Sequence, residues 1–210
     1  MIYSLAVIFF KSFFKLFFRT RLIGIENIPV DGPLIFAANH SSYADPPLIG
    51  SSVKRPVYFI AKKELFDVPL LNWLIEKMHA FPVDRGTADI SALKNAIKIL
   101  TAGNALLIFP EGTRYKKGKK IKLKNGAAML AVATGAYVVP VAILNSDRLF
   151  KMPRLILKFG VPVKFGAGRD YRSITEEIMS RIESLKTGSP AADDSTAYGN
   201  NAKNEDNNSK

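Results

Sequence analysis

Several residue types are missing or scarce in this chain, and each shortage narrows its chemistry. The 210 residues include no cysteine, which excludes disulfides and thiolate nucleophiles and gives no sign of an oxidising compartment. The two histidines, His40 and His79, lie far apart in sequence, so without cysteine they argue against a zinc site. No Gly-x-Ser-x-Gly turn is present, which disfavours an ordinary serine hydrolase. We therefore expect no metal site.

Nucleotide-binding loops are also missing. The stretch from Gly112 to Lys120 has the wrong spacing for a phosphate-binding loop and no Ser or Thr after its lysines. Gly166-Ala167-Gly168 lacks the third glycine of a dinucleotide-binding turn.

The sequence lacks an apolar run long enough to span a membrane. Residues 2–10 are uncharged but too few, and Lys11 and Lys15 would have to cross the bilayer. These charges follow the apolar run, and no small-residue cleavage site comes after it, which disfavours a signal peptide. At about 100° per residue, five polar residues of the segment 1–21 share one sector of roughly 100°, and the phenylalanines lie outside it: these five are Ser4, Lys11, Ser12, Lys15 and Arg19. The pattern predicts an amphipathic helix in a membrane interface; the alternative is a helix packed on the protein's own core.

Basic residues, in contrast, are abundant, and the formal charge is +12. Residues 187–210 hold two lysines and four acidic residues, a net of −2, so the remaining body carries +14. So basic a body indicates an anionic partner: nucleic acid, membrane phospholipid or a phosphorylated substrate. The segment 187–210 is rich in Ser, Asn, Asp and Ala, and we expect it to be a disordered tail.

Residues 22–186 have the alternating pattern of a single α/β domain. Short apolar runs predict strands at 33–38, 56–61, 80–83, 105–109 and 138–143, with one or two more in 155–165. Helical patterns lie between or after them, at 46–52, 69–78, 89–100, 126–134 and 173–185. This alternation predicts a mixed, mostly parallel sheet flanked by helices. Pro140 predicts an edge, a strand end or a bulge at its position.

Polar clusters follow three of these strands, at 40–45, 84–85 and 111–114. The ends of parallel strands converge on one rim of a sheet, so a shared site is expected there. In a continuous helix, His40 and Asp45 would point roughly 140° apart. Pro46, however, favours a helix start that makes Asp45 the N-cap, and the intervening turn could fold His40 back toward it. The pair is then either a general base with its orienting carboxylate or an ordinary capped loop.

The other polar clusters also allow two interpretations. Arg85 could hold a phosphate or pair with Asp84, and Glu111 to Arg114 could bind a polyol and an anion or form a self-satisfied turn. The lysine run could attract phosphates or anionic lipid, or be a solvated loop, and it lacks the interleaved aromatics of a nucleic-acid platform. Its members are Lys116, Lys117, Lys119, Lys120, Lys122 and Lys124.

Four sequence blocks, taken in their order along the chain, resemble those of a known protein family. The blocks are His40 with Asp45, Phe81-Pro82-Val83-Asp84-Arg85, Phe109-Pro110-Glu111-Gly112-Thr113-Arg114, and Val138-Val139-Pro140-Val141. Over roughly residues 24–165 the chain resembles the glycerolipid acyltransferase family typified by 1-acyl-sn-glycerol-3-phosphate acyltransferase. Where that family often has Phe-Lys-Lys-Gly after the third block, this chain has Leu123-Lys124-Asn125-Gly126.

The resemblance implies roles for individual residues. His40 would be the catalytic base of the His-x4-Asp motif, and Asp45 would orient it. The acceptor phosphate would be bound by Arg85 and by the block Glu111, Gly112, Thr113 and Arg114, with Lys124 a possible anion contact. Val139 and Pro140 would border the acyl-donor site.

The resemblance also implies a reaction and a location. A fatty acyl group would move directly from acyl-CoA or acyl carrier protein to the sn-2 hydroxyl of 1-acylglycerol 3-phosphate (lysophosphatidate). The product would be phosphatidic acid, and no separate cofactor would be needed. The expected location is the cytoplasmic face of a membrane, peripheral or monotopic, with anionic phospholipid as partner and no nucleic acid. Alternatives are another acceptor, such as glycerol 3-phosphate, lyso-ornithine lipid or another lysophospholipid, or a non-catalytic basic protein that binds membrane or nucleic acid.

Overall fold

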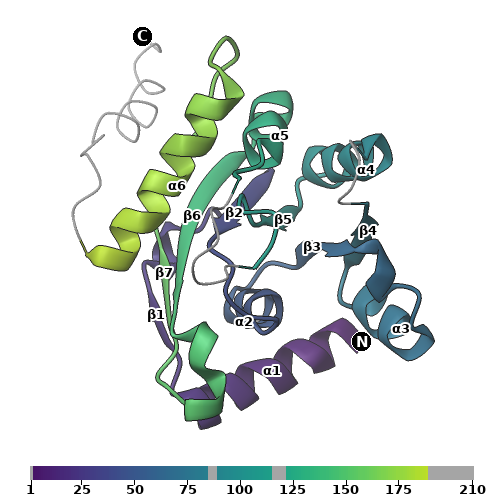
Figure 1. The fold of residues 1–210 in the computed structure, drawn as a ribbon, viewed down its shortest axis with the longest axis vertical. Coiled ribbons are helices and arrows are strands. Elements are labelled where there is room, and N and C mark those ends of the chain that lie inside the picture. Colours follow the sequence, from purple (N-terminus) through teal and green to yellow (C-terminus); the bar gives the residue numbers. More distant parts are fainter. Residues whose placement is uncertain (1, 85–88, 115–121, 189–210) are drawn as a thin grey trace, which may run out of the picture.

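A seven-stranded sheet with the order β1-β7-β6-β2-β5-β3-β4 forms the centre of the computed structural model, which describes residues 2–84, 89–114 and 122–188 (Figure 1). All neighbouring strands are parallel except β6 and β7, which are antiparallel. The strands are β1 (Arg21–Ile23), β2 (Leu34–Ala38), β3 (Val57–Lys62), β4 (Ala80–Val83), β5 (Ala105–Ile108), β6 (Tyr137–Leu144) and β7 (Ile156–Phe159). The predicted α/β domain with a mixed, mostly parallel sheet is confirmed.

Helices cover both faces of the sheet (Figure 1). They are α1 (Ile2–Phe18), α2 (Asp45–Ser52), α3 (Pro69–Lys77), α4 (Ile90–Thr101), α5 (Gly126–Thr134) and α6 (Tyr171–Thr187). In β2, Leu34 and Phe36 join the core beneath α1 and α2, whereas Ile35 and Ala37 join the core beneath α4, α5 and α6. This alternation explains why β2 is apolar at every position, as expected for a strand buried on both faces.

The first helix is only partly buried. Phe14 and Phe18 belong to the core that α1 shares with α2, whereas Phe9 and Leu16 are 63% and 75% exposed. Packing on the protein's own core is therefore observed for one face of this helix, and a membrane interface stays a prediction for the exposed face. None of the helices in the described ranges is both long and apolar enough to cross a bilayer.

One local prediction, the start of α2, was wrong in detail, and the irregular pairing beside Pro140 agrees with the bulge among the predicted alternatives. Helix α2 begins at Asp45 rather than after it, with Ala44 as the N-cap. Pro140 lies in the interior of β6, between β2 and β7, and not at an edge or at the end of its own strand. Regular pairing of β6 with β7 stops at Val141 and resumes as a single bridge from Val138 to Val163. The missing N–H of Pro140 thus falls where the neighbouring strand is interrupted.

Candidate functional site

The site lies at the carboxyl ends of β2 and β5, which are adjacent and parallel. The residues that follow these strands therefore meet at one rim, as the sequence predicts. The backbone N–H of His40 donates to Glu111 Oε2 at 3.2 Å, which joins the first and third blocks directly. Arg85, which follows β4, lies outside the described residues, as do the lysines at 116–120.

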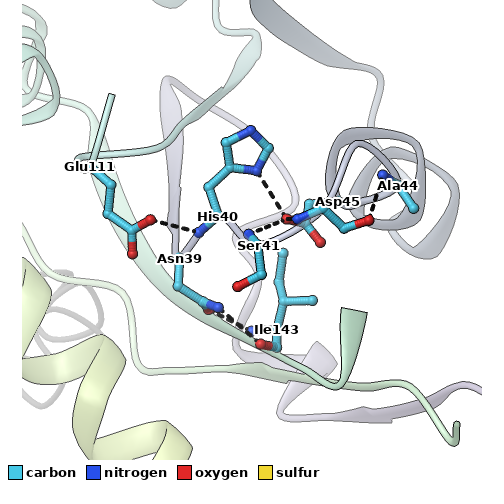
Figure 2. A network of polar contacts seen from close by, with 8 residues as sticks. Asn39, His40, Ser41, Ala44, Asp45, Glu111 and Ile143 are labelled. Atoms are coloured by element: carbon cyan, nitrogen blue, oxygen red, sulfur yellow. Dashed lines mark hydrogen bonds and ion pairs between the residues drawn. The ribbon is translucent and has the colours of Figure 1, made fainter. Parts of the chain in front are cut away.

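His40 and Asp45 are in direct contact. Nδ1 of His40 lies 2.9 Å from Oδ2 of Asp45 (Figure 2). The same oxygen accepts hydrogen bonds from the backbone N–H groups of Ser41 and Ser42, each at 2.7 Å. Asp45 is fully buried and His40 is only 8% exposed. The turn predicted to fold His40 back toward Asp45 is therefore present.

The Asp45 carboxylate does not cap the helix, contrary to the sequence-based expectation. Asp45 is the first residue of α2, and the next two residues, Pro46 and Pro47, have no N–H to offer a capping oxygen. The next donor in the chain, the N–H of Leu48, already bonds to Ala44 O at 2.9 Å. Because the first turn leaves no donors for a cap, the carboxylate is free to hold the preceding turn and the imidazole.

Two further residues support the imidazole, and sequence reasoning assigned a role to neither. The ring of Phe109 stacks on that of His40 with centroids 3.9 Å apart and planes 14° from parallel. Asn39 is buried, and its side-chain amide exchanges two hydrogen bonds with the backbone of Ile143, at 2.9 and 2.7 Å. Asn39 thereby continues the contact of β2 with β6 for one residue past Ala38. Because Asn39 is held in this way, the position of the next residue, His40, is fixed relative to the sheet.

Glu111 is a buried carboxyl at the same rim. It is 7% exposed, and burial raises its pKa to about 7, while the N–H of His40 and the charge of Lys186 act in the opposite direction. Its hydrogen bond goes to the His40 backbone, and no ion pair joins it to Arg114 in the part of the chain that the structure covers. The self-satisfied Glu–Arg turn considered from sequence is therefore not observed.

The rest of the third block lines the outer part of the site. Gly112 has φ +64°, in the left-handed region, and a Cβ there would lie 3.0 Å from Lys124 Cγ. Lys124 therefore lies beside this block, while Thr113 is exposed. Arg114 points to Tyr43, with its guanidinium carbon 3.5 Å from the ring centroid.

Val139 and Pro140 are not at the rim. They pair with Phe36 and Ala37 in β2 and are buried, so they lie within the sheet before His40 is reached. Their connection to an acyl donor stays a prediction.

The chain is similar to proteins of known activity. Residues 19–144 match the Acyltransferase family. The 1-acyl-sn-glycerol-3-phosphate acyltransferase of Bacillus subtilis is 32% identical over 171 residues, which cover 77% of this chain and 85% of that protein. A lyso-ornithine lipid O-acyltransferase of Pseudomonas aeruginosa is 37% identical over 113 residues, 53% of this chain and 43% of that protein.

A solved structure agrees with these sequence matches. The crystal structure of a 1-acyl-sn-glycerophosphate acyltransferase from Thermotoga maritima superposes with a TM-score of 0.68 at 34% identity, covering 86% of this chain and 79% of that chain. The matched fold and family residues include both blocks that form the His40 rim. The chain belongs to the Acyltransferase family of enzymes.

Proposed function

We propose that this acyltransferase moves a fatty acyl group from a thioester to the free sn-2 hydroxyl of 1-acylglycerol 3-phosphate, giving phosphatidic acid. The observation that carries the proposal is the buried contact of 2.9 Å between His40 Nδ1 and Asp45 Oδ2, at the rim beside Glu111. The acceptor is suggested by the names of the relatives from Bacillus subtilis and Thermotoga maritima.

In the proposed mechanism His40 is the general base. A proton on Nδ1, held by Asp45, leaves the lone pair of Nε2 free to accept the proton of the acceptor hydroxyl. The hydroxyl oxygen then attacks the thioester carbonyl, the C–S bond breaks, and His40 returns its proton to the departing thiolate. The acyl group passes directly between the substrates, so the step needs no residue acting as a nucleophile.

The acceptor phosphate requires cations near this base. Arg114 is the described candidate, since a guanidinium offers a planar fork of donors to phosphate oxygens. Lys124 lies beside Gly112 in the same block and is exposed. Arg85 is proposed for the same role from the family resemblance alone.

A thiol-release assay tests the chemistry. With acyl-CoA and 1-acylglycerol 3-phosphate, wild-type protein should release free thiol only when the acceptor is present. His40→Ala should lower kcat by about 10²–10⁴-fold, the usual contribution of a general base. A folded His40→Ala protein with near wild-type turnover would overturn the assignment.

A second acceptor class is favoured by one comparison, the relative from Pseudomonas aeruginosa that is named for lyso-ornithine lipid. The same assay should therefore be repeated with lyso-ornithine lipid, glycerol 3-phosphate and other lysophospholipids, using acyl-CoA and acyl carrier protein in turn. We expect the highest kcat/KM with 1-acylglycerol 3-phosphate. A higher value with lyso-ornithine lipid would transfer the proposal to that acceptor.

We also propose that α1 lies in the interface of an anionic membrane, at its cytoplasmic face. The core-facing side chains Phe14 and Phe18 occupy one side of the helix, and Lys11 and Lys15 occupy another. Between these sides an exposed apolar strip is formed by Leu5, Phe9, Phe13 and Leu16, which are 37–75% exposed. An apolar strip beside lysines fits the boundary between acyl chains and anionic headgroups.

A further inference from the structure

We infer that Tyr43 is a positioning residue that holds Arg114 ready for the phosphate of the acyl acceptor. The inference rests on the proposed function, in which Arg114 binds that phosphate. Tyr43 lies in the turn between β2 and α2, three residues after His40, and Arg114 follows β5. The two residues therefore come from the two neighbouring strand ends that build the site.

Tyr43 makes two different contacts with the Arg114 guanidinium. The guanidinium carbon lies 3.5 Å from the ring centroid, and Nη2 donates to the Tyr43 hydroxyl at 2.7 Å. The ring face fixes the plane of the guanidinium, and the hydroxyl fixes its rotation within that plane. An arginine side chain with several free torsions is thereby held in one orientation before the substrate arrives.

These contacts leave Arg114 able to bind an anion. A guanidinium has five N–H donors, and Tyr43 takes one of them. Within the described residues no carboxylate forms an ion pair with Arg114, so its charge is not neutralised there. Tyrosine thus orients the cation without competing for its charge, as an aspartate or glutamate in the same place would.

The exposure of Tyr43 argues against a role in core packing. The residue is 71% exposed, although it sits in the same turn as the buried His40 and Asp45. A side chain so exposed contributes little to stability through burial. Because Tyr43 and His40 share one short turn, holding Arg114 through Tyr43 also fixes the anion site relative to the base.

Steady-state kinetics with the full chain test this inference. At saturating acyl-CoA, Tyr43→Leu should raise the KM for 1-acylglycerol 3-phosphate by about 5- to 20-fold, since both contacts are lost. Tyr43→Phe keeps the ring face and should raise the KM for 1-acylglycerol 3-phosphate by about 2- to 5-fold. The KM for acyl-CoA, the kcat and the thermal unfolding midpoint should stay near wild-type values, which distinguishes positioning from a general structural role.

A double variant separates the inference from the proposal beneath it. If Tyr43 acts through Arg114, Tyr43→Leu should add nothing to the acceptor KM in an Arg114→Ala background. Independent, additive effects would overturn the inference while leaving the phosphate role of Arg114 intact, as would an unchanged KM in Tyr43→Leu alone. An unchanged KM in Arg114→Ala alone would reject the phosphate role, and the inference with it.

Discussion

The negative charge of Asp45 is the residue-scale feature on which the proposed base depends. Asp45→Asn keeps a carbonyl oxygen that can accept from Ser41 and Ser42, but it removes the charge that stabilises a protonated His40. The new amide group would occupy the place of Oδ1, which has no hydrogen-bond partner in the described structure. We expect kcat to fall by about 10²-fold or more while the fold persists.

Circular dichroism and thiol release, measured on one preparation, check this prediction. Asp147→Asn, in an exposed ion pair with Arg148, is the matched control and should retain full turnover. Equal activity of Asp45→Asn and wild type would show that the base does not depend on the negative charge of Asp45.

Glu111 gives a pH dependence of stability whose sign follows from its burial. Its pKa rises from an ordinary 4.5 to about 7, so the folded protein holds this proton more tightly than the unfolded chain. The stability from the protonated form is complete below about pH 4.5 and is lost as the pH rises through about 7. Glu111→Gln has no such proton to lose. Its free energy of unfolding, relative to that of wild type, should therefore rise by roughly 1–2 kcal/mol between about pH 5 and 8.

Urea denaturation at both pH values measures this difference. The exposed variant Glu76→Gln serves as the control, and its free energy of unfolding should follow that of wild type. A Glu111→Gln difference that does not change with pH would mean that this carboxyl titrates normally in the folded protein.

How far the site could be predicted depended on distance along the chain. The contact between His40 and Asp45 was predictable because five residues and a proline-rich helix start restrict the turn. The contacts of Asn39 with Ile143 and of Tyr43 with Arg114 join residues 104 and 71 positions apart. They depend on β2 lying between β6 and β5, an order that hydrophobic periodicity does not specify.

At the scale of the element, the proposed membrane contact of α1 can be tested separately from its core packing. Phe9→Gln with Leu16→Gln changes only exposed apolar positions and should weaken binding to anionic vesicles by about 10-fold, while the thermal midpoint stays constant. Ile90→Gln, on α4, is an equally exposed control that should bind as wild type does. Sedimentation with vesicles measures the binding, and identical binding by all three proteins would reject the membrane role of α1.

Deletion of the whole helix would be a poorer test. Phe14 is 3% exposed in the core beneath α1, and truncating such a phenylalanine costs about 3–5 kcal/mol. A deletion would therefore lose the fold together with the membrane contact. Sequence periodicity could not assign this packed side, because the apolar sector of the helix is wide enough to serve both functions.

At the scale of the whole molecule, the net charge of +12 predicts salt-sensitive binding. Attraction of the basic body to anionic headgroups is screened over about 10 Å at 0.1 M salt and over about 3 Å at 1 M. We expect binding to vesicles with anionic lipid to fall at least 10-fold between these salt concentrations, and binding to neutral vesicles to be weak at both. Salt-independent binding would assign the affinity to the apolar strip alone.

The fold class was predictable at this scale because strands and helices alternate along the chain. The position of β1 was not. Its three residues have no strand pattern of their own and pair with β7, which lies far along the chain. The antiparallel pairing of β7 with β6 could not be predicted either, because the apolar pattern of a strand does not specify the direction in which it runs.

The contacts of α1 finally bear on the order in which the chain can fold. The ring of Tyr3, near the start of the helix, stacks on His79 at 4.4 Å, and its hydroxyl accepts from the Val57 N–H. At the other end, Leu155 N donates to Phe18 O at 3.1 Å. Helix α1 therefore cannot complete its contacts until Leu155 has left the ribosome. Until then the inner face near Phe18 lacks the partners that Leu155 and Leu157 supply, so a membrane beside the nascent chain would offer those side chains an apolar phase that free solution does not.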